Sequence, residues 1–475
     1  MKRSEKMKRN AVWLVISLLV ALSLVLAACG PAPTPETVTV VETVVVTEKE
    51  EVEVPVEVTK EVEKEVVVTA TPEPRPEAET YALFYNTLFH SGDAQAMERI
   101  VELYNETHED TQFTFTQGQW AQYYAQMSNA VIAGNPPQIG ICHTSMLSQM
   151  YPALLPLEDT PAGNLLEVAG IEPGNYMQPL WEAGQRDGHQ YLIPLDSHMF
   201  GLWYNKDIFR EAGLDPDDPP ETMDEFVAAA DAIKDAGYHA FHPAEDALPR
   251  KLRRAWWVFF WQLGGELFDE DFTKATFNNE KGLEALEFLV SIVQERGWNE
   301  PGTDGFKQFT AGELGMFVAG NWMYWTASES GVDYGMAPMP VFFDQPATWG
   351  NSHNLVIPKP PGGVSPEVLV KSAEAIKWIN EHSDIWGIYG GHIPAYKPVF
   401  ESDELLQSDT WQKSLSVFAE MADQGWVQTE IAHPKGSQLS NAIQVRIQEA
   451  YNGTISPQEA LDKAEEECNA ILQGG

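Results

Sequence analysis

The chain has 475 residues, of which 44% are hydrophobic and 11% aromatic, with a formal net charge of −40. A chain of this length is too long for a single hydrophobic core and predicts two lobes or domains. The hydrophobic content excludes a largely disordered protein. The acidity argues against nucleic acid and anionic lipid surfaces as partners, since like charges repel.

The N-terminal residues 1–28 have the order of a secretory signal peptide. Five basic residues precede an apolar run from Ala11 to Ala28. The run ends Leu26-Ala27-Ala28-Cys29 and resembles the bacterial lipobox, in which cleavage occurs before a lipid-bearing cysteine. A plain membrane anchor is the alternative, because about 18 apolar residues nearly span a bilayer. We expect cleavage, lipidation of Cys29 and a remaining net charge of −44.

Residues 29–79 are predicted to form the lipid attachment site and a flexible tether. Val, Glu and Thr alternate in this segment, which closes with the proline-rich TATPEPRPEAET. Charge and proline disfavour a packed strand and favour an extended linker. Beyond Cys29, only Cys142 and Cys468 remain, and two separate buried thiols are expected from so wide a spacing.

From Tyr81 the pattern alternates between strands and helices. Apolar and alternating runs predict strands at 81–85, 113–116 and 138–142, and helical spacing predicts helices at 94–104 and 120–132. This βαβαβ succession predicts an α/β lobe with a parallel sheet. Further helices are expected at 206–212, 222–236, 252–263, 281–296 and 366–380, with an extended piece at 354–357. Thr222 and Glu225 have the spacing of a capping box.

Five stretches in order resemble one family. They are LWYNKDIFREAGL with PPETMDEF at 202–226, FTAGELGMFVAGNW at 309–322, WGNSHNLVIPK at 349–359, GGHIPA at 390–395, and NGTISPQEAL at 452–461. Together they are similar to the extracellular solute-binding proteins of ABC importers, which include maltose-type and other sugar receptors. Met223 departs from the tryptophan usual at its position in that family.

The resemblance implies an α/β, type II periplasmic-binding-protein-like fold with two hinged lobes and a ligand cleft between them. We place lobe 1 at 80–200 plus 341–400, and lobe 2 at 201–340 plus 401–475. It further implies a non-catalytic receptor, without cofactor or metal. Such a receptor captures a small solute, here expected to be a sugar or oligosaccharide, and delivers it to permease subunits of the importer. With the lipid on Cys29, the protein would be anchored at the extracytoplasmic face of the membrane.

Trp322 is the leading candidate for ligand stacking. In sugar receptors of this family, the tryptophan at its position covers the apolar C–H face of a pyranose ring, while polar groups meet the hydroxyl rim. Trp325 and Met323 are expected to pack in the core. The remaining candidates lie at strand ends, beside the crossing segments or in a tryptophan-rich helix: Asn321, Trp349, Asp196, His90, Ser91, Thr144, Ser145, His198, Ser352 and Trp257.

Structural roles compete with several of these assignments. His90, Ser91 and Ser145 are placed to cap helices that follow them, and Asp196 to hold hinge backbone amides. The basic run Arg250–Arg254 would suit an anionic ligand, but such a run is more often a solvated helix face paired with Asp and Glu.

Other functions remain open at the level of sequence. A secreted carbohydrate-active enzyme on a similar scaffold is one alternative, although the sequence has none of the common metalloprotease, P-loop, dinucleotide or nucleophile-elbow motifs. A receptor for a glycerol phosphodiester, a peptide or a polyamine is another.

Overall fold

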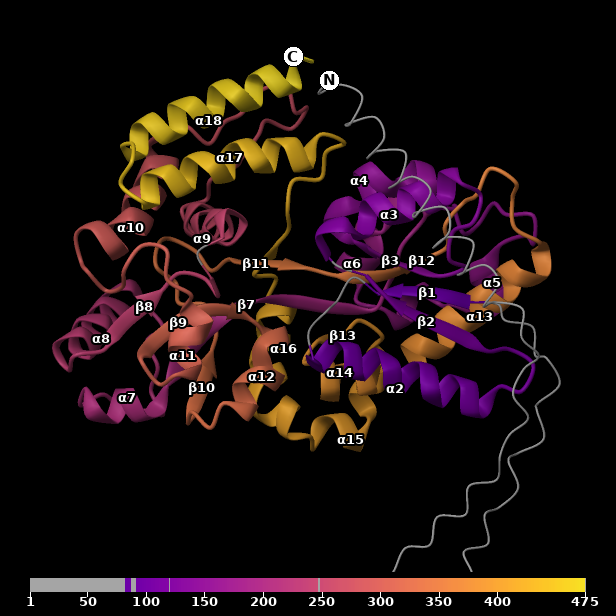
Figure 1. The fold of residues 1–475 in the computed structure, drawn as a ribbon, viewed down its shortest axis with the longest axis horizontal. Coiled ribbons are helices and arrows are strands. Elements are labelled where there is room, and N and C mark those ends of the chain that lie inside the picture. Colours follow the sequence, from indigo (N-terminus) through magenta and orange to yellow (C-terminus); the bar gives the residue numbers. More distant parts are fainter. Residues whose placement is uncertain (1–81, 87–90, 119, 247, 475) are drawn as a thin grey trace, which may run out of the picture. The chain divides into compact units, whose positions relative to one another are not determined.

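The computed structural model describes residues 82–86, 91–118, 120–246 and 248–474, which all belong to one compact unit, residues 76–475 (Figure 1). The predicted signal peptide, Cys29 and the predicted tether lie outside the described residues, and so does His90. None of the helices in the described ranges combines the length and apolar character that a membrane span requires.

The first βαβ unit forms as predicted. β1 (Ala82–Asn86) pairs in parallel with β2 (Phe113–Gln117), and α2 (Ser91–Thr107) makes the crossover between them. The apolar positions of α2 recur at helical spacing and therefore share one buried face. That face carries Met97, Ile100, Val101 and Tyr104.

The next strand joins a segment from far along the chain. After α3 (Trp120–Ile132), β3 (Gly140–His143) pairs antiparallel with β12 (His353–Val356), which also pairs antiparallel with β6 (Ile193–Pro194). The predicted parallel sheet is therefore confirmed only for β1 and β2. It is wrong for β3, which belongs to a separate three-stranded sheet because the returning strand β12 lies beside it.

The ten-residue strand β7 (Asp196–Asn205) is buried along its whole length and is central to the largest sheet. β11 (Thr348–Asn351) lies antiparallel to its first half, with Asn351 opposite His198. β9 (Leu314–Gly320) lies along its second half, and the short β13 (Ile393–Pro394) pairs with its first residues. Four segments that are distant in sequence, β7, β9, β11 and β13, therefore meet at Asp196–Phe200.

Helices cover the sheet around β7. They are α7 (Lys206–Glu211), α8 (Met223–Asp235), α9 (Pro249–Gln262) and α10 (Glu280–Gln294). The capping box of α8 is confirmed: the Thr222 side chain accepts from the Glu225 backbone N–H, and the Glu225 side chain accepts from the Thr222 backbone N–H.

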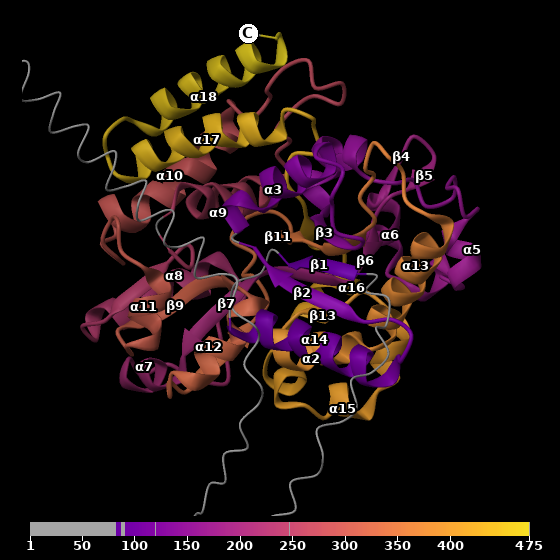
Figure 2. The ribbon, with the colours of Figure 1, turned by 45° about the vertical axis from the view of Figure 1, so that its right-hand side comes forward.

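C-terminal helices complete the unit. α13 (Pro366–Glu381) and α14 (Ser383–Gly390) precede β13, and α17 (Gly436–Tyr451) and α18 (Pro457–Leu472) follow it. α17 packs on both α9 and α18, and the two C-terminal helices lie side by side in both ribbon views (Figures 1 and 2).

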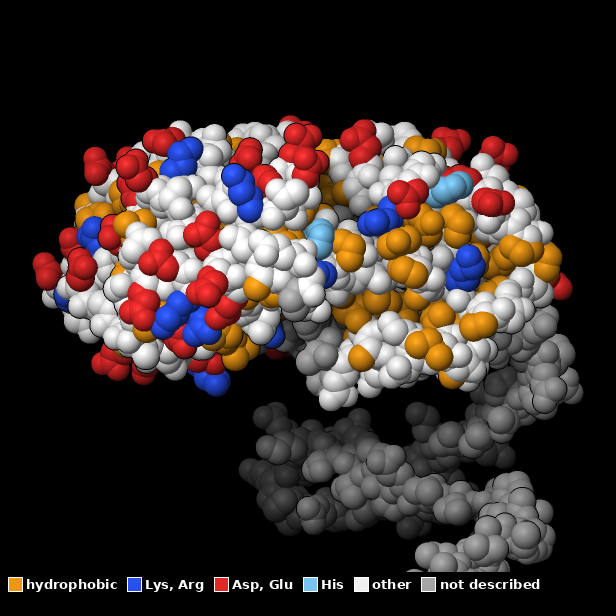
Figure 3. Space-filling model, turned by 90° about the horizontal axis from the view of Figure 1, so that it is seen from above, with side chains coloured by type: hydrophobic (Ala, Val, Ile, Leu, Met, Phe, Trp, Pro, Cys, Tyr) orange, Lys and Arg blue, Asp and Glu red, His pale blue; other side chains and the backbone are white. Residues whose placement is uncertain are grey.

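The described residues form two hydrophobic cores. One draws its members from 96–195 and 355–386, and the other from 199–349 and 393–468. Cys142 belongs to the first and Cys468 to the second, and both are buried free thiols, which confirms the expectation of two separate cysteines. In the face drawn in Figure 3, acidic side chains gather over the left half and the upper edge, and hydrophobic ones over much of the right half.

Candidate functional site at the crossing strands

The fold brings most of the predicted ligand residues together near the start of β7. Asp196 and His198 lie on β7, and Trp349 lies on β11. The ring centroids of Trp322 and Trp349 lie 5.5 and 6.1 Å from that of His198. Asn321 and Trp322 come from the short helix after β9 (Asn321–Met323), and Thr144 and Ser145 from the one after β3 (Thr144–Met146).

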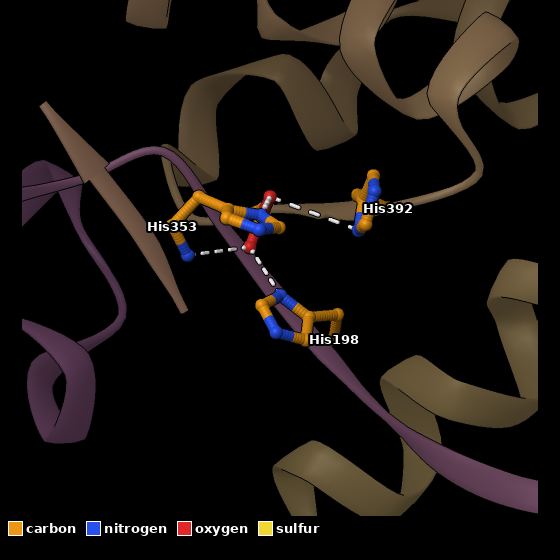
Figure 4. Close-up of side chains that lie close together, drawn as sticks. His198, His353 and His392 are labelled. Atoms are coloured by element: carbon orange, nitrogen blue, oxygen red, sulfur yellow. Dashed lines mark hydrogen bonds and ion pairs between the residues drawn. The ribbon is translucent and has the colours of Figure 1, made fainter. Parts of the chain in front are cut away.

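Asp196 is the centre of a buried cluster of hydrogen bonds (Figure 4). Its Oδ1 accepts from His198 Nδ1 at 3.0 Å and from the backbone N–H of His353 at 3.0 Å. Its Oδ2 accepts from His353 Nδ1 and from Trp386 Nε1, each at 2.7 Å. Asp196 therefore holds a backbone amide of the crossing region, which is the structural role that the sequence predicted for it. It also orients two imidazole rings.

His392 completes this cluster from the segment that leads into β13. Its Nδ1 lies 3.7 Å from Asp196 Oδ2, and its Nε2 lies 2.9 Å from Oδ1 of Asp93 on α2. All four charged or ionisable members of this Asp196 cluster (Asp196, His198, His353 and His392) are at most 3% exposed. Four segments far apart in sequence thus converge on one carboxylate.

The electrostatics of the cluster are set by burial and by mutual contact. Burial disfavours the Asp196 carboxylate, but the charges of His353 and His392 and the hydrogen bond from His198 hold its pKa well below the usual value. Burial lowers the pKa of His198 to about 3. Burial also opposes charge on His392, yet Asp93 and Asp196 raise its pKa. Near neutral pH the cluster therefore combines an ionised Asp196 with a neutral His198.

His143, from the end of β3, extends this array of rings. Its ring centroid lies 4.5 Å from that of His353, and the Tyr124 hydroxyl lies 2.6 Å from its Nδ1. The same hydroxyl accepts from the His143 backbone N–H, so its own proton is available to Nδ1. Burial lowers the pKa of His143 well below its ordinary value, which keeps the ring neutral.

Trp322 is half-buried and borders this array. Its indole folds back over Gly320, where an added Cβ would meet the ring at 2.1 Å, so glycine is what allows this conformation. The ring is perpendicular to Trp349, with centroids 6.1 Å apart. Trp349 comes from β11 and Trp322 from the short helix after β9, and both rings lie beside His198.

Cations from α9 cover both indoles. The Arg254 guanidinium lies 3.7 Å from the Trp349 ring centroid, and Lys251 Nζ lies 5.2 Å from that of Trp322. Arg254 also pairs with Glu430, with its Nε 2.8 Å from Oε1, and Lys251 pairs with Glu245. Arg253 lies 3.5 Å from Glu430.

The expectation of a solvated basic helix face is therefore wrong for these α9 cations (Lys251, Arg253 and Arg254). They are 4–8% exposed, and burial lowers the pKa of Arg253 to about 10. The expected pairing with carboxylates is present, but it occurs inside the protein, because α17 and the Glu430 segment cover the helix.

Other candidate side chains already have partners within the protein. Asn321 accepts from the Met199 backbone N–H and donates to the Gly391 carbonyl, which ties β9 to β7 and β13. Ser145 accepts from Asn351, and Thr144 accepts from Asn354. The Ser352 hydroxyl donates to the His353 carbonyl oxygen at 3.1 Å.

Two further candidates do not join this group. Trp257 is fully buried in the second core, against Trp261 and beneath Arg253. Ser91 begins α2, with its side chain outside the described part of the structure. Sequence reasoning missed Asp93, Trp386, His392 and Glu430. His392 fills the variable position of the GGHIPA stretch, where nothing marks a histidine as functional.

The architecture resembles known solved structures. The crystal structure of cyclic alpha-maltosyl-1,6-maltose binding protein from Arthrobacter globiformis matches with a TM-score of 0.67 and 22% identity, covering 83% of this chain and 99% of that chain. The structure of UgpB from Mycobacterium tuberculosis in complex with glycerophosphocholine matches with a TM-score of 0.70 and 18% identity, covering 82% and 98%. The fold is thus that of the two-lobe, type II periplasmic-binding proteins, as predicted.

Sequence comparison identifies the family. The model described as bacterial extracellular solute-binding protein matches residues 90–360, more than half of the chain. The sn-glycerol-3-phosphate-binding periplasmic protein UgpB of Rhizobium meliloti is 27% identical over 349 residues, covering 66% of this chain and 75% of the relative. The UgpB of Pectobacterium atrosepticum is 24% identical over 310 residues, covering 61% and 67%. The chain belongs to the bacterial extracellular solute-binding protein family, which confirms the predicted solute-binding role in an ABC importer.

Proposed function

We propose that this protein captures a small carbohydrate beside Trp322 and Trp349 and delivers it to the permease of its importer. The observation that carries this proposal is the pair of perpendicular indoles at the crossing strands. An indole face covers the C–H face of a sugar ring, and neighbouring polar groups meet its hydroxyls. His198, Lys251 and Arg254 supply polar groups against these two rings.

The charge balance beside the indoles favours an uncharged cargo. Lys251 is paired with Glu245, and Arg254 with Glu430, so each cation already has a carboxylate partner. Trp322 is half-buried, whereas Trp349 is 2% exposed, so a sugar can stack on Trp349 only after its neighbours, Arg254 among them, move away. Sugar hydroxyls both donate and accept, so they can bridge such pairs without adding a buried charge.

Delivery follows from linkage between binding and closure. Trp322 and Trp349 both pack in the core of 199–349 and 393–468, although the proposed lobe bounds (80–200 plus 341–400, and 201–340 plus 401–475) would separate them. A solute that lies on these indoles and also contacts the other core stabilises the closed state over the open one by its extra contacts. The permease would then recognise the closed form.

The test is a titration of the folded protein with a panel of mono- and oligosaccharides, followed by calorimetry and small-angle scattering. We expect one sugar to bind and to reduce the radius of gyration. Trp322→Ala should weaken that sugar at least tenfold, which corresponds to about 1.4 kcal/mol. Trp325→Ala is the matched control, because this half-buried indole packs beside Tyr389. Absence of binding across the panel, or equal binding by Trp322→Ala, would reject the carbohydrate assignment.

A glycerol phosphodiester is the second candidate cargo. Arg254 and Lys251 supply the positive charge that a phosphate requires, and relatives named for glycerol phosphate compounds share the family. Adding sn-glycerol 3-phosphate and glycerophosphocholine to the same panel distinguishes the two. Recovery of the bound compound unchanged after long incubation would support a receptor, and its cleavage would support the enzyme alternative.

We further propose that the protein is held at the extracytoplasmic face of the membrane by a lipid on Cys29. The charged and apolar order of residues 1–28 supports export. Mass spectrometry of the mature N-terminus should find acylated Cys29, and Cys29→Ala should release the protein from the membrane fraction. An intact residue 1–28 segment in the wild-type protein would instead support a plain membrane anchor.

A further inference from the structure

We propose that the Asp196 cluster is a binding site for a divalent transition-metal ion of the zinc class. Asp196, His198, His353 and His392 each offer one ligand atom, and these four atoms lie within 4.8 Å of one another. Imidazole nitrogens and a carboxylate oxygen are the ligands that zinc prefers, whereas calcium and magnesium prefer oxygen alone. This proposal does not depend on the nature of the cargo.

The spacing of the cluster suits a tetrahedral ion. Asp196 oxygens lie 2.7, 3.0 and 3.7 Å from Nδ1 of His353, His198 and His392. With metal–ligand bonds of about 2.0–2.1 Å, neighbouring ligand atoms of a tetrahedral site are about 3.3 Å apart. The contacts to Asp196 are near this spacing, but the four ligand atoms extend over up to 4.8 Å, so some of the side chains must move by about an ångström or more to surround an ion.

His392 supplies an independent indication of a missing ligand. Its Nδ1 is buried and has no hydrogen-bond partner, although the ring is only 1% exposed. Its other nitrogen, Nε2, is held by the Asp93 carboxylate. A carboxylate on the far nitrogen is the arrangement that orients metal-binding histidines in proteins. A cation would take the place of a proton on Nδ1 and satisfy this atom.

The position of the site gives it a structural consequence. Asp196 and His198 come from β7, His353 from β12, and His392 from the segment before β13. An ion bound to all four would tie together the segments at which the chain passes between its two cores. Because the ion would bind the folded state and not the unfolded chain, the melting temperature should rise as the metal concentration rises.

The test uses the folded full-length chain, treated with a chelator and then titrated with zinc chloride by calorimetry. We expect one equivalent to bind, and His392→Gln and His198→Gln each to weaken it at least tenfold. Asp93→Asn should weaken it by about 10–100-fold, since it removes the orienting carboxylate. His242→Gln is the control, because His242 is equally buried but lies outside the cluster.

X-ray absorption on the wild-type complex provides a readout that does not depend on variants. Imidazole ligands at about 2.0–2.1 Å would support the site. A shell of oxygen ligands only, absence of one-equivalent binding, or unchanged zinc affinity in the folded His198→Gln/His392→Gln double variant would overturn the proposal.

Discussion

The Asp196 cluster and the α9 cations bury charge in opposite ways, and both border Trp322 and Trp349. In the cluster, one carboxylate accepts hydrogen bonds from three residues on separate segments, and a fourth residue, His392, lies beside it. On α9, three cations from one helix share two carboxylates, and each of them also covers an indole.

The difference shows which arrangement depends on a single residue. Three side chains and one backbone N–H donate to Asp196, so its loss leaves several buried donors without an acceptor. The α9 cations have alternatives, since an aromatic face partly replaces a carboxylate. We therefore expect Asp196 to be the more sensitive position of the two regions.

Asp196→Ala should have the largest effect. It leaves the Trp386 indole N–H and the His198 and His353 ring N–H groups unsatisfied in the interior. Removing one partner of a buried charged network costs about 3–5 kcal/mol, and the upper end applies here. Urea unfolding followed by circular dichroism measures this loss.

The control for Asp196→Ala is Asp409→Ala. Asp409 is paired with Lys413, but its side chain is 81% exposed, so its loss should cost less than about 1 kcal/mol. Equal losses in the two variants would contradict the central role of Asp196.

Glu430→Ala should come next and probes the other region. It removes the carboxylate shared by Arg253 and Arg254, both of which are buried. We expect a loss of about 3 kcal/mol in the free energy of unfolding, at the lower end for a broken buried pair, because the indoles of Trp257 and Trp349 still face the two guanidinium groups. A loss larger than that of Asp196→Ala would reverse the comparison.

His242 allows the cluster to be compared with a single buried histidine. Its ring is fully buried, with Nδ1 2.5 Å from the Ala244 carbonyl oxygen, and burial lowers its pKa from 6.5 to about 4. Between these pH values the unfolded chain holds a proton that the folded chain does not, so acidification lowers stability. This single group should account for about 3 kcal/mol between pH 6.5 and pH 4.

The measurement is urea unfolding of the wild type and of His242→Gln across that pH range. The variant should lose the pH-dependent part of the free energy of unfolding that comes from His242. It should keep the pH-dependent part that comes from the Asp196 cluster. An unchanged slope in His242→Gln would assign the acid sensitivity to other groups.

The comparison also explains what the sequence could predict. The helices and most strands follow from local periodicity, and five ordered motifs indicated the family. The α9 cations are adjacent in sequence and were recognised as a group. Their burial was missed, because the covering residue Glu430 lies 176 positions from Arg254.

The Asp196 cluster was only half predictable for the same reason. Asp196 and His198 were candidates because they begin a crossing strand. His353, Trp386 and His392 reach Asp196 only through the fold, across 157 to 196 positions in the chain, and Asp93 reaches His392 across 299. No local sequence pattern predicts contacts between residues so far apart. By contrast, Gly320, which lies beneath the Trp322 ring, is only two positions away in the GNW stretch.

Arg254→Lys should have the smallest effect and sharpens the account of the α9 cations. The planar guanidinium stacks on Trp349 and donates its Nε–H to Glu430 at the same time. A lysine ammonium keeps the charge but lacks the flat face and the fork of donors, so it can satisfy only one of these partners well. We expect the free energy of unfolding to fall by about 1–2 kcal/mol, measured by urea unfolding and compared with Glu430→Ala and with the double variant.

If the losses of Arg254→Lys and Glu430→Ala add in the double variant, the stacking on Trp349 and the pairing with Glu430 are independent. If the double variant is no worse than Glu430→Ala alone, the indole contributes only by positioning Arg254 for its carboxylate, and the α9 cations then depend on one acceptor as much as the cluster depends on Asp196.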